Sequence, residues 1–119
     1  MILVDTSIWI DHLRDANPGL VKLLFADEVA THPFVIGEMA LGTLRRRREI
    51  LDLLAALPHL ETAADQDVLR FVEEHGLPGT GIGWVDAHLL VAVQAAGASL
   101  LTSDKSLRSA AARLGVGHD

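Results

Sequence analysis

The chain has 119 residues; half of them are hydrophobic, 22% are charged, and it contains neither cysteine nor tyrosine. These numbers predict one folded domain over residues 1–119 and exclude intrinsic disorder, disulfide bonds, thiolate zinc sites and a cysteine or tyrosine nucleophile. The formal net charge is −6. Any contact with nucleic acid must therefore rest on a local basic patch or on bound cations.

The amino terminus lacks a basic region, and its apolar run stops at Asp5, so no signal peptide is expected. The longest hydrophobic stretch, residues 89–101, is interrupted by Gln94 and is too short to span a bilayer. We expect a cytoplasmic protein that makes no membrane contact.

Short apolar runs alternate with segments of helical periodicity along the chain. In chain order, strands are expected at residues 2–4, 29–31 and 99–102, with a brief one at 59–60. Helices are expected at residues 8–13, 20–25, 33–44, 45–57, 65–75, 84–96 and 105–114. The pattern predicts an α/β fold, specifically a three-layer α/β/α domain with a small central parallel sheet.

Local residue chemistry supports several of these boundaries. Residues 2–4 form an apolar, β-branched run without a polar break, which suits a strand that is buried on both faces. Pro33 fits the first turn of a helix. Gly76 and Gly97 each follow a periodic segment and are typical helix stops.

Two acidic residues directly follow predicted strands. Asp5 comes after the first strand and Asp104 after the last, and ligands of parallel sheets bind beyond the carboxyl ends of the strands. Each also fits a second interpretation, because Asp is a favoured cap at a helix N-terminus.

Two further acids lie within predicted helices on faces that carry apolar or small residues. Glu38 shares its face with Phe34, Val35 and Leu41, and Asp86 shares its face with Ile82 and Leu89. We therefore expect both carboxylates to look inward, where an unpaired charge costs several kcal/mol. A buried salt bridge, a hydroxyl partner or a shared cation would compensate that cost.

Taken together, the four acids favour the shared cation. Clustered carboxylates repel one another, and a divalent ion removes that repulsion. Oxygen ligands favour Mg²⁺ or Mn²⁺, the ions of phosphoryl and phosphodiester chemistry. Neighbouring hydroxyl residues would position the attacking water or hold a carboxylate, or would instead cap helices: Thr6, Ser7, Thr102 and Ser103.

The sequence resembles the PIN domains, in particular the VapC-type ribonuclease toxins of toxin–antitoxin pairs. The resemblance covers essentially the whole chain, and Trp84 stands where tyrosine or another aromatic residue is usual. Four segments carry it, in order: residues 2–7 (ILVDTS), 32–38 (HPFVIGE), 81–90 (GIGWVDAHLL) and 101–104 (LTSD).

The resemblance implies a function and partners. The matching acidic quartet, which would bind Mg²⁺ or Mn²⁺ and carry catalysis, is Asp5, Glu38, Asp86 and Asp104. The implied activity is cleavage of single-stranded or looped RNA, with tRNA as one candidate, leaving 3′-hydroxyl and 5′-phosphate ends. The implied partners are a second copy of the chain and a VapB-type antitoxin that covers the acidic groove. The apolar dimer surface would come from the helices over residues 20–25 and 51–57.

The only basic run is Arg45 to Arg48. It suits a solvated helix face or a helix end. Alternatively, it contacts RNA phosphates, in which case Arg45, Arg46 and Arg48 are the candidate RNA-binding residues.

Other conspicuous residues have simpler interpretations. His32 and His88 are expected to pack or to form hydrogen bonds rather than to bind metal. Residues 79–83 are rich in glycine but match neither the Walker loop nor the dinucleotide fingerprint, so they predict a flexible approach to the next helix. Trp9 and Trp84 are expected in the core or an interface.

Two other functions compete with the nuclease. A receiver-like or haloacid-dehalogenase-like phosphotransfer domain would use Asp5 as a covalent nucleophile. Thr6 and Ser7 argue against this, since a receiver needs an acidic pair there and the phosphatase motif needs Asp at position 7. A non-catalytic binding module of the same fold is the second alternative, and the full set of four acids argues against it.

Overall fold

The computed structural model describes all residues from 1 to 119. Three short strands form a parallel sheet in the order β2-β1-β3, in which Ile2 pairs with Val29 and Leu3 pairs with Leu100. The strands are β1 (Ile2–Val4), β2 (Val29–Ala30) and β3 (Ser99–Leu101). The helices are α1 (Thr6–Arg14), α2 (Pro18–Phe25), α3 (Pro33–Leu41), α4 (Arg47–Ala56), α5 (Asp65–Glu74), α6 (Trp84–Ala96) and α7 (Lys105–Arg113).

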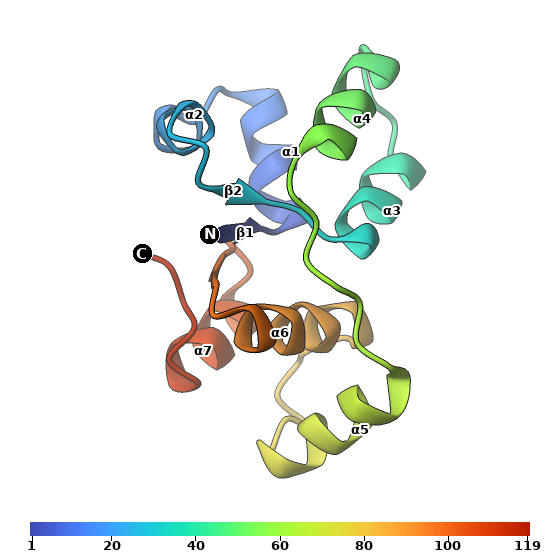
Figure 1. The fold of residues 1–119 in the computed structure, drawn as a ribbon, viewed down its shortest axis with the longest axis vertical. Helices are drawn as coiled ribbons and strands as arrows, with labels where there is room; N and C mark the ends of the chain where they lie inside the picture. Colours follow the sequence, from blue (N-terminus) through green and yellow to red (C-terminus); the bar gives the residue numbers. More distant parts are fainter.

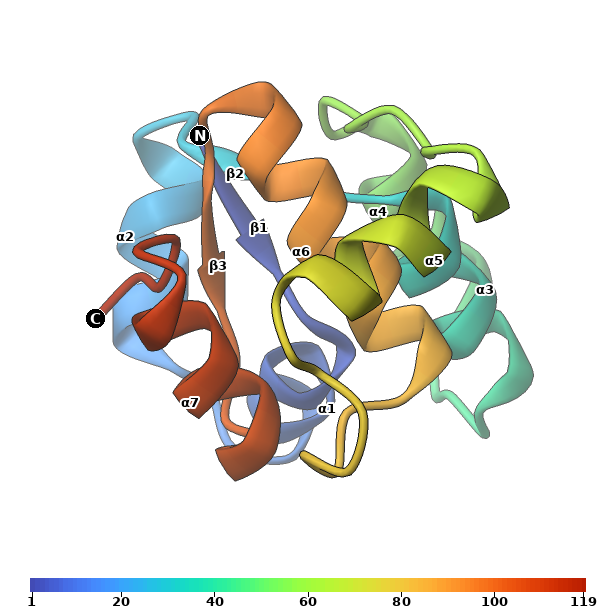
Figure 2. The same ribbon diagram turned by 90° about the horizontal axis from the view of Figure 1, so that it is seen from below.

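The helices cover both faces of the sheet. Helices α1 to α4 lie on one face, and α5, α6 and α7 lie on the other (Figures 1 and 2). The predicted three-layer α/β/α architecture is confirmed. Because all three strands run in the same direction, their carboxyl ends share one edge of the sheet, where β1 leads into α1 and β3 leads toward α7 (Figure 2).

The sheet is the centre of the hydrophobic core. Its middle strand is fully enclosed, as the uninterrupted apolar run predicted, because helices pack on both of its faces. Trp9 also belongs to this core, which confirms the core interpretation for that tryptophan. The fully buried residues of the core include Leu3, Val4, Leu89, Leu90, Val93 and Leu100.

Most predicted elements are present, with changes at their ends. Helix α3 stops at Leu41 rather than near residue 44, because Gly42 is extended. Helix α4 begins at Arg47 rather than at residue 45, since Arg46 has a left-handed backbone with φ 55°. The brief strand at residues 59–60 reduces to a single parallel bridge between His59 and Thr31.

No helix combines the length and the apolar composition that a membrane span requires.

Candidate active site

Asp5 ends the central strand and is the most deeply buried of the four candidate acids, with 6% of its surface exposed. It occupies the N-cap position of α1, yet its side chain caps no backbone N–H group. Instead, its Oδ2 accepts hydrogen bonds from Ser7 Oγ and from Thr102 Oγ1, both at 2.8 Å. The capping interpretation is therefore wrong for Asp5, and two hydroxyl groups compensate the burial of its charge.

Asp104 follows β3 and starts α7. Its Oδ1 accepts the backbone N–H of Leu107 at 2.9 Å, so the capping interpretation is confirmed for this residue. Its own N–H donates to Thr102 Oγ1 at 3.1 Å. Thr102 thus connects the backbone of Asp104 to the carboxylate of Asp5.

Glu38 lies on α3, and its side chain is exposed rather than turned inward. The expected burial is wrong, because the face that Glu38 shares with Leu41 and Gly42 reaches solvent at the end of α3. Leu41 itself is 90% exposed. Glu38 Oε1 accepts a hydrogen bond from Thr6 Oγ1 at 2.9 Å, which fixes the carboxylate against the start of α1.

Asp86 is the third residue of α6 and is half-buried. Its Oδ2 accepts the N–H of Gly83 at 3.1 Å. Burial has the largest effect and raises the pKa of the Asp86 carboxyl, the Gly83 hydrogen bond opposes this increase, and the negative charges of Asp5, Asp104 and Glu38 raise the pKa further. Asp86 therefore feels the charges of all three other candidate acids.

None of the four acids is neutralised by a basic side chain. The ion pairs of the structure join Arg46 to Glu49 and Arg70 to Asp67, and His88 lies within hydrogen-bond distance of Asp65. As the side chains lie, no three acidic or histidine side chains form a group that could hold a metal ion. The four carboxylates gather charge at one edge of the sheet without closing into a coordination shell.

Each of the four carboxylates has one oxygen held by a neighbour and one that accepts no hydrogen bond within the protein. The held atoms are Asp5 Oδ2, Glu38 Oε1, Asp86 Oδ2 and Asp104 Oδ1. The remaining four oxygens form a donor set without nitrogen or sulfur, which fits a hard divalent cation such as Mg²⁺ or Mn²⁺.

The four hydroxyl residues of this region behave in two ways. Thr6, Ser7 and Thr102 hold carboxylates, as one of their two interpretations predicted. Ser103 neither holds one of the four acids nor caps α7. Its backbone N–H donates to Ser7 Oγ at 3.1 Å, and its Oγ donates to Asp11 Oδ2 at 3.3 Å.

Sequence analysis missed Asp11, an exposed acid beside this network. Its signal was available, because Asp11 lies four residues after Ser7 and therefore shares a face of α1 with it.

A model of the PIN domain family matches residues 2–113 of the chain. The chain belongs to the PIN-domain family. Ribonuclease VapC32 of Mycobacterium tuberculosis, in two strains, is 50% identical over 117 residues, which are 98% of this chain and 94% of that protein. The match places the chain among the VapC-type PIN domains, as the sequence motifs predicted.

The PIN fold is also found in a solved structure. The crystal structure of PAE2754 from Pyrobaculum aerophilum superposes with a TM-score of 0.69, covering 99% of this chain and 87% of that one. At 19% identity, the likeness shows the fold alone.

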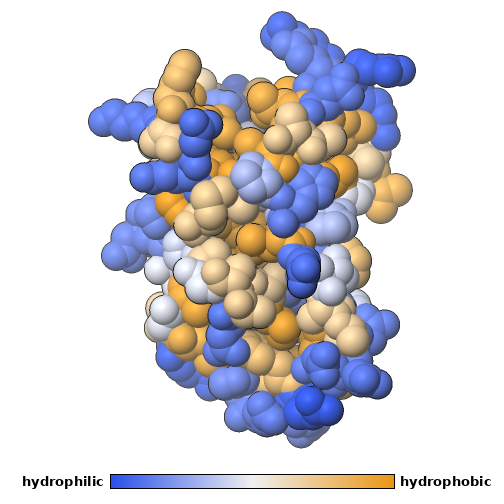
Figure 3. Space-filling model, viewed as in Figure 1, coloured by the Kyte–Doolittle hydropathy of each residue, from blue (hydrophilic) through white to orange (hydrophobic).

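Beside the acidic edge, the PIN domain has a groove of about 560 Å³ between α1, α3 and α4. Glu38 lines it together with Arg14, Arg45 and Arg46, whereas Arg48 does not. Hydrophilic side chains project over the segment between α3 and α4 (Figure 3). Two of the three candidate RNA-binding arginines thus share a groove with one candidate acid.

Arg47 has a structural role in this region. It donates to the carbonyl oxygens of Ala40 and Gly42 and so caps the C-terminal end of α3. Arg46 is paired with Glu49 at 2.9 Å.

His32 and His88 are buried within the PIN domain, and they pack and form hydrogen bonds as predicted. His32 Nδ1 accepts the N–H of Phe34 at 3.0 Å and caps α3. Burial, together with the charges of His88 and His59, lowers the pKa of His32 to about 4. His88 Nε2 lies 3.2 Å from Asp65, and Trp84, which is 43% exposed, packs edge-on against the His88 ring.

Proposed function

We propose that the chain is a metal-dependent endoribonuclease that acts as a cytoplasmic toxin. Its 50% identity to Ribonuclease VapC32 supports the substrate class. The observation that carries the proposal is that Asp5, Glu38, Asp86 and Asp104 each keep one carboxylate oxygen free of hydrogen bonds and that none of them has a basic partner. The raised pKa of the Asp86 carboxyl, to which the charges of the other three acids contribute, supports it. A folded protein that gathers four carboxylates with no basic partner gains stability from a cation.

In this proposal, Asp5, Glu38, Asp86 and Asp104 bind Mg²⁺ or Mn²⁺ through the oxygens that accept no hydrogen bond within the protein. These carboxylates would hold an ion whose chemistry, when it is bound, would be activation of water and neutralisation of the charge that develops on the phosphate. Glu38 is exposed and Asp86 is half-buried, so both carboxylates would remain accessible to an ion at the end of the central strand.

The chain's own residues prepare the site for phosphodiester hydrolysis. Ser7 and Thr102 donate their hydroxyl protons to Asp5 Oδ2 and fix the orientation of this carboxylate. Thr6 does the same for Glu38 across the gap between α1 and α3. Glu38 and Asp104 have exposed carboxylates, and if they do not bind the ion directly they would position the attacking water.

The proposal includes the partners that the family implies. A VapB-type antitoxin would neutralise the enzyme, and two copies of the chain would form a homodimer. A monomeric mass at all concentrations, or an enzyme that no antitoxin inhibits, would remove this part of the proposal and leave the nuclease standing.

The direct test is cleavage of single-stranded RNA by the purified protein. Wild type is expected to cut in Mg²⁺, to stop when EDTA is added, and to leave 5′-phosphate ends. Asp5→Asn and Asp86→Asn are expected to abolish cutting, whereas Asp52→Asn, an equal change of charge on the exposed face of α4, is expected to cut like wild type. Cutting by all three variants would refute the assignment.

A further inference from the structure

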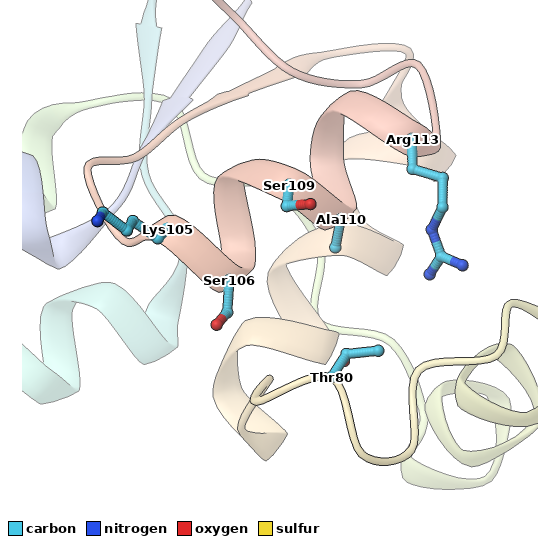
Figure 4. A pocket seen from close by; sticks show the side chains of 6 residues that line it. All are labelled: Thr80, Lys105, Ser106, Ser109, Ala110 and Arg113. Carbon is cyan, nitrogen blue, oxygen red and sulfur yellow. The ribbon is translucent and has the colours of Figure 1, made fainter.

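A second pocket lies along α7, the helix that begins directly after Asp104. It has a volume of about 290 Å³. One wall is α7, and the opposite wall is Thr80 in the loop before α6 (Figure 4). The lining residues are Thr80, Lys105, Ser106, Ser109, Ala110 and Arg113.

The two walls approach closely where Gly81 faces Ser106. A Cβ atom at Gly81 would lie 2.9 Å from Ser106 Oγ, and Gly81 has a positive φ of 84°, so the backbone here favours glycine. Thr80 is also fixed, because its Oγ1 donates to the carbonyl of Leu77. The pocket is therefore built by the packing of the glycine-rich loop on α7, which sequence analysis described only as a flexible approach.

The chemistry of the lining suits an anion. Arg113 brings a positive charge that is not paired with a carboxylate, and no acidic residue lines the pocket. Lys105 lines the far end of the pocket, and its side chain points away from the other lining side chains (Figure 4). Arg113 donates one hydrogen bond to the carbonyl of His75 and keeps its other N–H groups. The hydroxyls of Ser106 and Ser109 add neutral donors. Guanidinium and hydroxyl donors together match the oxygens of a phosphate group.

The position of the pocket links it to the acidic edge. Lys105 directly follows Asp104, and its side chain points toward that end of α7 (Figure 4). Arg113 lies eight residues further on, about 12 Å along the helix axis. An RNA strand whose cut site lies at the four acids would pass along α7 and place a neighbouring phosphate here.

We propose that this pocket binds a backbone phosphate of the RNA substrate next to the cut site. The proposal rests on the proposed ribonuclease function and adds to it a strand path along α7. Positive charge at this pocket also explains how an acidic protein holds a polyanion beside four carboxylates, since the phosphate contact lies away from them.

Single substitutions on α7 test the proposal with matched charge. Arg113→Gln and Ser109→Asp each lower the net charge by one within the pocket. Arg108→Gln makes the same change on α7 outside it, because the lining residues of this helix fall within an arc of about 140° that excludes position 108. Ser109→Asp leaves Arg113 in the chain and places a carboxylate four residues before it, where the carboxylate would compete with a phosphate for the guanidinium group.

The measurement is the affinity for a labelled single-stranded RNA in EDTA, by fluorescence anisotropy over a range of NaCl concentrations. Without metal no strand is cut, so binding is measured independently of cleavage. Arg113→Gln and Ser109→Asp are expected to weaken binding several-fold. A plot of log affinity against log salt concentration has a negative slope, and for Arg113→Gln this slope should be less steep by about 0.7. Arg108→Gln should match wild type in both quantities.

Each result has a definite meaning. If Arg113→Gln and Ser109→Asp bind RNA no worse than Arg108→Gln, the pocket proposal is wrong, even if wild type cleaves RNA. The same holds if inorganic phosphate binds in an Arg113-dependent way while RNA affinity does not change. If wild type fails to cleave RNA in Mg²⁺ yet shows Arg113-dependent RNA binding, the nuclease assignment fails and the phosphate site stands.

Discussion

At the scale of single residues, two hydroxyl groups fix the position of the Asp5 carboxylate. Thr102 is the central one, because it donates to Asp5 at 2.8 Å and accepts the N–H of Asp104 at 3.1 Å. Ser7 shares the same Asp5 oxygen. Loss of a side chain that orients a metal ligand in this way typically lowers metal affinity by about 10- to 100-fold.

Removal of the Thr102 hydroxyl should therefore weaken metal binding without unfolding the protein. Thr102→Val keeps the shape of the side chain and should lower the affinity for Mn²⁺ by about 10- to 100-fold, measured by calorimetric titration. Thr102→Ser keeps the hydroxyl and should bind nearly as wild type does. Equal affinities of the Val and Ser variants would show that the hydroxyl does not orient Asp5.

Asp86 should make the metal-free protein less stable at neutral pH. Because the pKa of its carboxyl is raised in the folded state, the folded protein binds this proton more readily than the unfolded chain does. The destabilisation is present above the folded pKa and disappears as pH falls below the unfolded value.

In EDTA, Asp86→Asn should accordingly be more stable than wild type at pH 7, and the difference should vanish toward pH 3. Urea unfolding across this pH range measures it. The asparagine can still accept the Gly83 N–H, so the helix cap is preserved. A difference that is constant with pH would contradict the cause assigned to the shift.

At the scale of elements, the sequence predicted the strand–acid–helix units well. The apolar run before Asp5 and the periodicity of α6 follow directly from burial, so their positions could be read from residue types. The exposure of Glu38 could not be predicted from the sequence, because α3 is apolar on most sides and its pattern does not tell which face is covered by the rest of the protein. The role of Asp104 could not be predicted either, since an aspartate that caps a helix and an aspartate of a functional site have the same pattern in the sequence.

The loop between α5 and α6 offers a test of packing between elements. Gly79 and Gly81 both have positive φ values, 79° and 84°, but only Gly81 faces a close neighbour, Ser106 Oγ. Gly79→Ala should lower the free energy of unfolding by about 1 kcal/mol, because of backbone strain alone. Gly81→Ala should lower the free energy of unfolding by about 2–3 kcal/mol, because the new methyl group also displaces Ser106.

Chemical unfolding measures both losses. Adding Ser106→Ala to Gly81→Ala should recover part of the lost stability and should recover none in the Gly79→Ala background. Equal losses of stability at the two glycines would mean that the close approach of Gly81 to Ser106 does not limit the size of the residue at position 81.

At the scale of the whole molecule, the four acids come from both layers of helices and from the sheet between them. Glu38 belongs to the layer of α1 to α4, Asp86 and Asp104 belong to the layer of α6 and α7, and Asp5 ends the central strand (Figures 1 and 2). A shared cation would join these three layers. Metal binding should therefore raise the melting temperature of the entire fold rather than order one loop.

The most direct test of a shared cation is calorimetric titration of Mn²⁺ into wild type, Asp86→Asn and the charge-matched Asp52→Asn. The account predicts saturable binding to wild type and to Asp52→Asn, with the affinity of Asp86→Asn at least about tenfold lower. Identical titrations of all three proteins, or no binding to any of them, would contradict it.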